Sequence, residues 1–172
     1  VKNNDYSRTS GRINLDQTFS KYFKGGITVS YSHIKSNDVP ISGKSGSTTL
    51  FMAARKYDPT IPIRDENGNY ALGRIYGLAQ NPASILDATM LTKKDNLLTS
   101  AFLDIMPVKG LVVKTTVGYD RKFASTGAYF PMTTQEGINA NGGIAKINEN
   151  NLSNYYINTT ATYNKIFAND HA

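Results

Sequence analysis

Residues able to do chemistry are few in this chain, and their spacing assembles no reaction centre. Cysteine and tryptophan are absent, and the two histidines, His33 and His171, stand far apart. A disulfide framework, a thiolate zinc site and a cysteine nucleophile are therefore excluded, and a histidine-based metal site or a Ser-His-Asp triad is a poor hypothesis. No carboxylate pair or nucleophile with a base occurs at a usable spacing. The sequence predicts no catalytic residue, no metal, no cofactor and no enzymatic activity.

The densest group of acidic and amide side chains is Asp65-Glu66-Asn67-Gly68-Asn69. An EF-hand calcium loop places glycine at its sixth position, whereas Gly68 stands at the fourth. Because Asn-Gly favours a type I′ turn, we interpret residues 61–72 as a small hairpin rather than a cation site. The stretch 47–56, with Ser47 as a candidate N-cap, predicts a short helix before it.

The net charge of 19 − 13 = +6 comes from scattered basic residues, with no Lys/Arg run longer than two. Nucleic-acid binding proteins usually cluster their basic residues around an identifiable motif, so we predict no nucleic-acid partner. The longest apolar run, 50–54, is far shorter than the ~20 residues that a transmembrane helix needs.

Alternation of apolar and polar residues dominates the chain and predicts β-strands near 6–20, 26–36, 95–106, 110–121 and 151–166. In the clearest strand, Ile27, Val29 and Tyr31 fall on one face, opposite serine and threonine. Short connections alternate with long ones, near 37–94 and 122–150, and compact soluble domains rarely contain such long loops. Transmembrane β-barrels show this rhythm, with strands of at least ~9–11 residues. We therefore predict an all-β fold: an antiparallel segment of about five strands from a large transmembrane β-barrel with long extracellular loops.

Three groups of side chains are candidates for function in such a wall. Aromatic girdles at the membrane surfaces are expected from Tyr31, Tyr119 and Tyr155 at the long-loop ends and from Phe19 and Tyr163 at the short-turn ends. Polar residues expected to face the lumen, where they pair across strands or form a solvated wall, are Arg12, Asp16, Lys114 and Asp120. Loop aromatics that contact substrate or a partner, or pack locally, are Tyr57, Tyr70, Tyr76, Tyr129 and Phe130.

Several short motifs are spread over nearly the whole chain in a fixed order. They are Ser10–Asp16, Gly26–Ser32, Ile63–Tyr70, Asn81–Leu86, Lys109–Asp120 and Thr162–Lys165. Each is weak alone, but their order and spacing resemble the SusC/RagA-like TonB-dependent outer-membrane transporters.

This resemblance implies a multi-pass protein of the Gram-negative outer membrane, with a barrel of about 22 strands around an N-terminal plug. Such transporters import glycans or peptides, are capped by a SusD-like surface lipoprotein, and draw energy from TonB through the plug. The plug, the TonB box and most of the barrel are missing from the 172 residues. We therefore expect either a part of a longer chain or one chain in a larger assembly, in contact with outer-membrane lipid.

Two alternatives remain open at the level of sequence. A soluble β-sandwich that binds carbohydrate or acts as an adhesin would bury one set of apolar side chains in a dry core, whereas a barrel would expose the same set to lipid: Ile27, Val29, Leu111, Val113, Ile157 and Ala161. A porin-like channel without TonB coupling would share the barrel.

Overall fold

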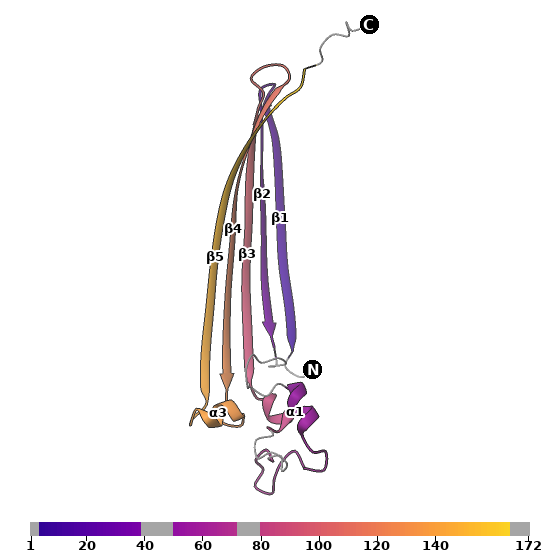
Figure 1. Cartoon of the computed structure of the whole chain (residues 1–172), viewed down its shortest axis with the longest axis vertical. Coiled ribbons are helices and arrows are strands. Elements are labelled where there is room, and N and C mark those ends of the chain that lie inside the picture. The colour runs from indigo at the N-terminus through magenta and orange to yellow at the C-terminus, as the bar shows by residue number, and fades with distance from the viewer. Residues whose placement is uncertain (1–3, 39–49, 72–79, 166–172) are drawn as a thin grey trace. The chain divides into compact units, whose positions relative to one another are not determined.

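The computed structural model describes residues 4–38, 50–71 and 80–165, which form one sheet and three short helices. The strands are β1 (Asp5–Ser20), β2 (Phe23–Asn37), β3 (Thr89–Ile105), β4 (Leu111–Phe130) and β5 (Ile144–Tyr163), and the helices are α1 (Leu50–Lys56), α2 (Pro82–Ile85) and α3 (Gln135–Asn139). The strands pair antiparallel in chain order, β1-β2-β3-β4-β5 (Figure 1). The predicted all-β fold with about five antiparallel strands is confirmed.

The strands are longer than the side-chain alternation predicts. β3 begins at Thr89 rather than near 95, β4 continues to Phe130 rather than ending near 121, and β5 begins at Ile144 rather than near 151. Both faces of these extensions carry many polar residues, so the alternation fades there, but backbone pairing needs no apolar side chain and continues. The predicted loops 37–94 and 122–150 are therefore too long, because each includes parts of strands.

The contacts of the chain divide it into two compact units, and every strand passes from one into the other. The turn unit comprises 9–33, 95–123 and 151–172, and the loop unit comprises 1–8, 34–94 and 124–150. These divisions fall within a few residues of the predicted strand and loop boundaries. The alternation thus marks the limits of a structural unit rather than the ends of the strands.

Short turns close the hairpins of the turn unit. The Tyr22 amide donates to Ser20 Oγ at 3.1 Å, and the Met106 amide donates to the Tyr22 carbonyl at 2.8 Å. Gly110 adopts a φ of 88°, which favours glycine, and its carbonyl accepts from the Asn164 amide at 2.7 Å. A side chain at Gly110 would collide with the carbonyl oxygen of Asn164.

The loop unit holds a small apolar core, in which Ala53 of α1 and Ile85 of α2 are buried and Leu50 and Leu86 pack against them. The predicted hairpin is present: Arg64 and Tyr70 form an antiparallel bridge, and Asp65 Oδ1 accepts from the amides of Asn67 at 2.9 Å and Asn69 at 2.8 Å. The acidic cluster therefore shapes a turn, as expected. The predicted helix is described from Leu50 onward, and Ser47 lies outside the described residues. Among the described residues, no helix has the length and apolarity to cross a membrane.

Candidate functional site

Side-chain contacts in the turn unit assign every strand residue to one of two faces. Odd-numbered residues meet one another across the strands: Tyr31 with Asp95 at 2.5 Å, and Thr115 with Thr159 at 3.1 Å. Even-numbered residues meet on the opposite side: Asn96 with Ser32 at 3.3 Å, and Lys114 with Asp104 at 3.9 Å. The register therefore runs without slippage through β2, β3, β4 and β5, and each face has a fixed composition.

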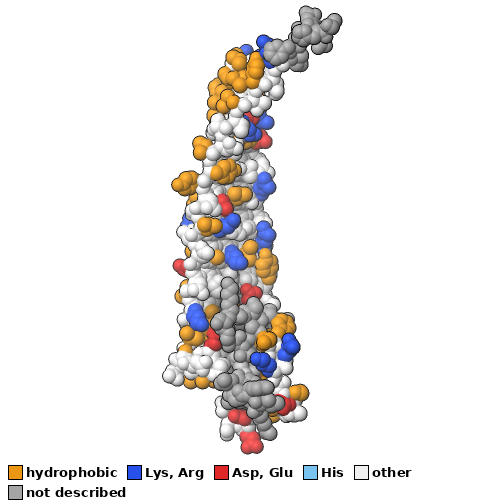
Figure 2. Space-filling model, in the orientation of Figure 1, with side chains coloured by type: hydrophobic (Ala, Val, Ile, Leu, Met, Phe, Trp, Pro, Cys, Tyr) orange, Lys and Arg blue, Asp and Glu red, His pale blue; other side chains and the backbone are white. Residues whose placement is uncertain are grey.

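The odd-numbered face of the turn unit is apolar and exposed. We call apolar face the odd-numbered positions of 13–19, 23–31, 97–105, 111–119 and 155–163, which carry no charged side chain. Ile13, Leu15 and Ile157 are each more than 60% exposed on it. Hydrophobic side chains also lie at the surface along the strands in Figure 2. Such a surface requires a nonaqueous or protein neighbour.

Aromatic residues border the apolar face at both ends, although not where the sequence placed all of them. Phe19 and Tyr163 lie at the short turns, as expected. Tyr31, Tyr119 and Tyr155 lie in the strand interiors, so their predicted position at the long-loop ends is wrong, because β2, β4 and β5 continue beyond them. Each stands eight positions from the short-turn end of its strand: 31 − 23, 119 − 111 and 163 − 155.

The even-numbered face carries all four polar residues that the sequence assigned to one wall. Arg12 Nε donates to Asn14 Oδ1 at 3.2 Å, and Asp120 lies 3.1 Å from Lys122 Nζ on its own strand. Asp16 lies beside Gly26 of β2, where a side chain at the glycine would meet its carboxylate. The four residues do not pair with one another, and the contacts of Arg12 and Asp120 lie within their own strands. For these two residues the arrangement fits the solvated wall, the second of the two roles left open.

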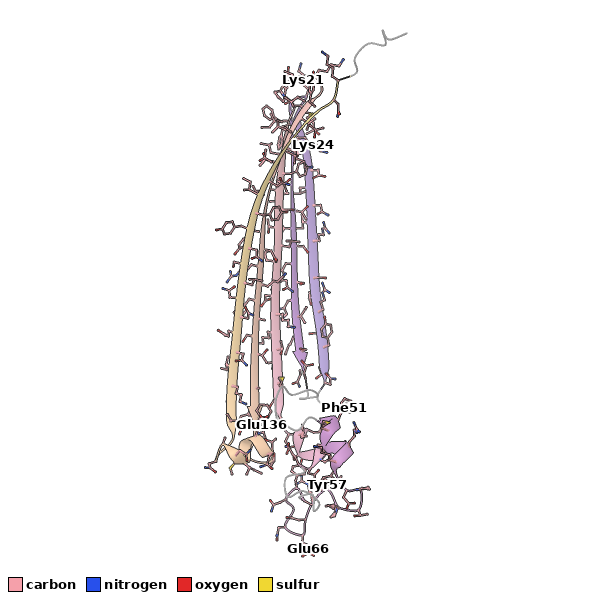
Figure 3. All side chains as sticks on the ribbon, viewed as in Figure 1. Lys21, Lys24, Phe51, Tyr57, Glu66 and Glu136 are labelled. Carbon is pink, nitrogen blue, oxygen red and sulfur yellow. The ribbon has the colours of Figure 1, made fainter. Side chains whose placement is uncertain are left out.

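Lys114 has the most developed surroundings on the even-numbered face. Its Nζ lies 3.9 Å from Asp104 Oδ1 and 4.5 Å from the ring centroid of Phe102, and Lys24 Nζ approaches the same ring at 5.9 Å. Figure 3 shows Lys24 near the short-turn end of the strands. The sequence missed Phe102 and Asp104, because the alternation of β3 is noisy and only the register reveals which residues face Lys114.

Tyr57 is half-buried in the loop unit, and its hydroxyl joins other segments of that unit. Its hydroxyl donates to the Ala71 carbonyl at 2.9 Å and accepts from Asn81 Nδ2 at 3.0 Å. Burial raises the pKa of Tyr57, while the hydrogen bond from Asn81 opposes the rise. This arrangement matches local packing, the second of the two roles left open for the loop aromatics.

Tyr70 lies in the hairpin and is half-buried, as Tyr57 is. Its hydroxyl donates to Asp87 Oδ1 at 3.1 Å, and the Arg64 guanidinium lies over its ring at 4.5 Å from the centroid. Burial, followed by the hydrogen bond to Asp87, raises the pKa of Tyr70. A cavity of about 520 Å³ opens beside these residues and is also lined by Asn69, Gln80 and Gln135.

The remaining loop aromatics divide by exposure. Phe130 is 8% exposed and lies under Lys146 Nζ at 5.2 Å, whereas Tyr129 is 49% exposed. Tyr76 lies outside the described residues. Tyr129, which is exposed, and Tyr70, which lines the cavity, are thus the described loop aromatics best placed to touch another molecule.

Comparison with known proteins finds similarity at the level of structure. No family model matches the chain, and no curated protein matches it. The structure of the RagAB peptide importer in the "open-open" state matches 74% of this chain and 15% of its own chain, with a TM-score of 0.52 and 22% identity. The structure of the RagAB peptide transporter matches 75% of this chain and 15% of its own, with a TM-score of 0.50 and 24% identity. The chain thus spans about 15% of the length of these proteins and shares their fold over that part.

Proposed function

We propose that the chain is a section of the wall of an outer-membrane β-barrel importer, a SusC-like TonB-dependent transporter that takes up peptides or glycans with a SusD-like surface lipoprotein. In this proposal the apolar face meets lipid, the even-numbered face lines the lumen, and the loop unit lies outside the cell. Substrate passes by binding and release, without covalent chemistry.

The observation that carries the proposal is the exposed, charge-free apolar face bordered by aromatic residues at both ends. Eight positions of strand measure about 26 Å, which at a tilt of about 40° corresponds to about 20 Å across a bilayer. The apolar band of outer-membrane barrels is about 25 Å tall and lies between aromatic girdles. The height of the apolar face, about 20 Å, is close to the height of that band, about 25 Å. This similarity favours lipid as the neighbour of the face.

The distribution of buried residues weighs against a soluble β-sandwich. That hypothesis needs Ile27, Val29, Leu111, Val113, Ile157 and Ala161 in one dry core. They share one face of the sheet, but Ile27 is 41% and Ile157 73% exposed, and no second sheet covers them among residues 4–38, 50–71 and 80–165. The buried apolar residues described in the chain belong instead to the loop segments and strand extensions: Ala53, Ile85, Ala88 and Phe130.

The two edges of the sheet fit a section of a larger barrel. Within the described sheet, β1 and β5 each have a single neighbouring strand. An unpaired strand edge in hydrocarbon leaves backbone groups without hydrogen bonds, which is costly. In a membrane, both edges therefore require further strands, as a large barrel supplies.

The lipid contact is tested by labelling single cysteines in the whole protein. This chain contains no cysteine, and any cysteine elsewhere in the protein is replaced. A fluorophore on Val117→Cys reports the apolar face, and its matched control, Thr116→Cys, reports the opposite face of the same strand. In lipid bilayers that contain nitroxide-labelled lipid, we expect strong quenching at 117 and weak quenching at 116. Equal quenching, or a reversed order, contradicts the proposal.

Import is tested in cells by uptake of labelled oligopeptides and oligosaccharides with and without TonB. The proposal predicts uptake that stops when TonB is removed. Uptake that persists without TonB identifies a porin-like channel instead.

A further inference from the structure

A group of polar residues lies immediately beyond the tyrosine border of the apolar face. Asp95 of β3 is its centre: one oxygen, Oδ1, accepts from the Tyr31 hydroxyl at 2.5 Å and lies 2.8 Å from His33 Nδ1. Both partners belong to β2. Oδ1 of the carboxylate is therefore held by β2.

Arg121 of β4 stands on that other side and shares the same odd-numbered face. It is exposed, and its guanidinium forms no hydrogen bond or ion pair with any residue of the described part of the chain. Its neighbour in sequence, Lys122, points to the opposite face and pairs with Asp120 at 3.1 Å. Lys122 is thus paired, whereas Arg121 retains free guanidinium donors.

A hollow lies beside Arg121 on the odd-numbered face. It is lined by Tyr31, Asp95, Leu97, Arg121 and Phe123. Leu97 and Phe123 are apolar and half-buried, and Leu97 belongs to the apolar face. A ligand for this hollow needs an anionic group for the guanidinium and an apolar body for the surface beside it.

We propose that this hollow binds the phosphate headgroup of a lipid in the outer leaflet, with Arg121 as the anchor. The inference rests on the proposed function, because it needs the apolar face in lipid. A planar guanidinium donates two parallel hydrogen bonds to phosphate oxygens, while Leu97 and Phe123 lie where the first carbons of the acyl chains leave the headgroup. Asp95 opposes the anion through its charge, while Tyr31 and His33 of β2 hold its Oδ1.

The test is a titration of the whole protein in neutral detergent with dioctanoyl phosphatidic acid, read by native mass spectrometry. We expect Arg121→Ala to weaken binding about fivefold, the effect of one basic residue near a membrane surface. Arg121→Lys keeps the charge but loses the paired geometry, so an intermediate affinity is expected. The matched control, Lys122→Ala, keeps the wild-type affinity. Equal affinity of wild type and Arg121→Ala overturns the inference.

A second variant tests the electrostatics without removing the anchor. Asp95→Asn still accepts hydrogen bonds from Tyr31 and His33 but no longer repels phosphate, so tighter binding of phosphatidic acid is expected. Weaker binding by Asp95→Asn contradicts the role given to Arg121.

Two further arms separate the sources of failure. Inorganic phosphate that displaces the lipid at equal concentration shows a site for free phosphate and overturns the lipid assignment. Lipid quenching at Val117→Cys, measured on the same preparation, reports the proposed function. If 117 is quenched while Arg121→Ala binds normally, this inference alone fails, and if 117 is not quenched, the proposed function fails.

Discussion

The Asn81 side chain donates from Nδ2 to the Ile63 carbonyl at 2.8 Å, and so joins the start of α2 to the hairpin. The same nitrogen lies 3.0 Å from the Tyr57 hydroxyl and 3.2 Å from the Ala71 carbonyl. Its Oδ1 accepts from the Ala83 amide at 3.0 Å and thereby caps α2. One side chain, 2% exposed, thus holds three segments of the loop unit.

Replacing Asn81 by aspartate separates its two roles. The Asn81→Asp variant would keep the helix cap but lose the amide donor and bring a charge toward two carbonyls. We expect the hairpin to loosen, at a cost of about 3 kcal/mol in local opening free energy. A fluorophore is attached to Glu66→Cys at the hairpin tip (Figure 3). Loosening of the hairpin lowers the fluorescence anisotropy of this label. The matched control, Asn67→Asp, changes an exposed asparagine and leaves the anisotropy unchanged. An unchanged signal in Asn81→Asp contradicts the assignment.

Tyr57 makes the stability of the same hairpin depend on pH. Burial raises its folded-state pKa above the ordinary value of 10.0. The stability from the neutral hydroxyl is therefore fully present below that value and is lost as the pH rises through the folded-state pKa. The anisotropy of the Glu66→Cys label should therefore fall in wild type as the pH rises above the ordinary tyrosine pKa of 10.0. Tyr57→Phe should be less anisotropic at neutral pH and should lose the part of the transition due to Tyr57. An identical alkaline transition in Tyr57→Phe argues against this role.

The outline of the sheet is predictable from sequence because the apolar face repeats every second residue. Ile27, Val29 and Tyr31 alternate with polar residues, and this alternation predicts a half-exposed strand. The ends of the strands are not predictable in this way, since β4 continues to Phe130 through backbone pairing that leaves no hydrophobic signature. For the same reason, Tyr119 was assigned to a strand end although it lies in the middle of β4.

The candidate site was harder to predict, because its residues act through neighbours that are distant in sequence. In the sequence Asn81 stands out only as part of a motif, because its partners lie 10 to 24 positions away. Arg121 carries no signal of its own, because only the structure shows that its side chain has no hydrogen bond or ion pair with the described residues. The hairpin around Asn67-Gly68, in contrast, is predicted correctly, but its turn is not of type I′. That turn needs a positive φ at both central residues, and of the two only Gly68 has one, at 80°. The Gly68 amide instead donates to the Asp65 carbonyl at 3.0 Å.

Gly118 and Tyr156 form a pair on the even-numbered face. A side chain at Gly118 would overlap the Tyr156 ring, which lies over the glycine from β5. Gly118→Val should therefore displace the ring and lower stability by about 1–3 kcal/mol. In the double variant with Tyr156→Ala, the added side chain has space, so the two costs should not add. Thermal unfolding of the whole protein measures the stability of the wild type, the two single variants and the double variant. If the two losses of stability are strictly additive, the contact is excluded.

Ile27 and Thr28 provide the sharpest comparison between the two faces. Ile27 stands midway between Phe23 and Tyr31 on the apolar face, so a lysine there would lie near the bilayer midplane, at a cost of about 2–4 kcal/mol. Thr28→Lys places the same charge on the polar face of the same strand, where water is available to solvate it. We expect Ile27→Lys to reduce the amount of folded, heat-modifiable barrel in outer membranes, and Thr28→Lys to leave it near the wild-type level. Equal losses would indicate that both faces are packed against protein, and a loss confined to Thr28→Lys would assign the lipid to the opposite face.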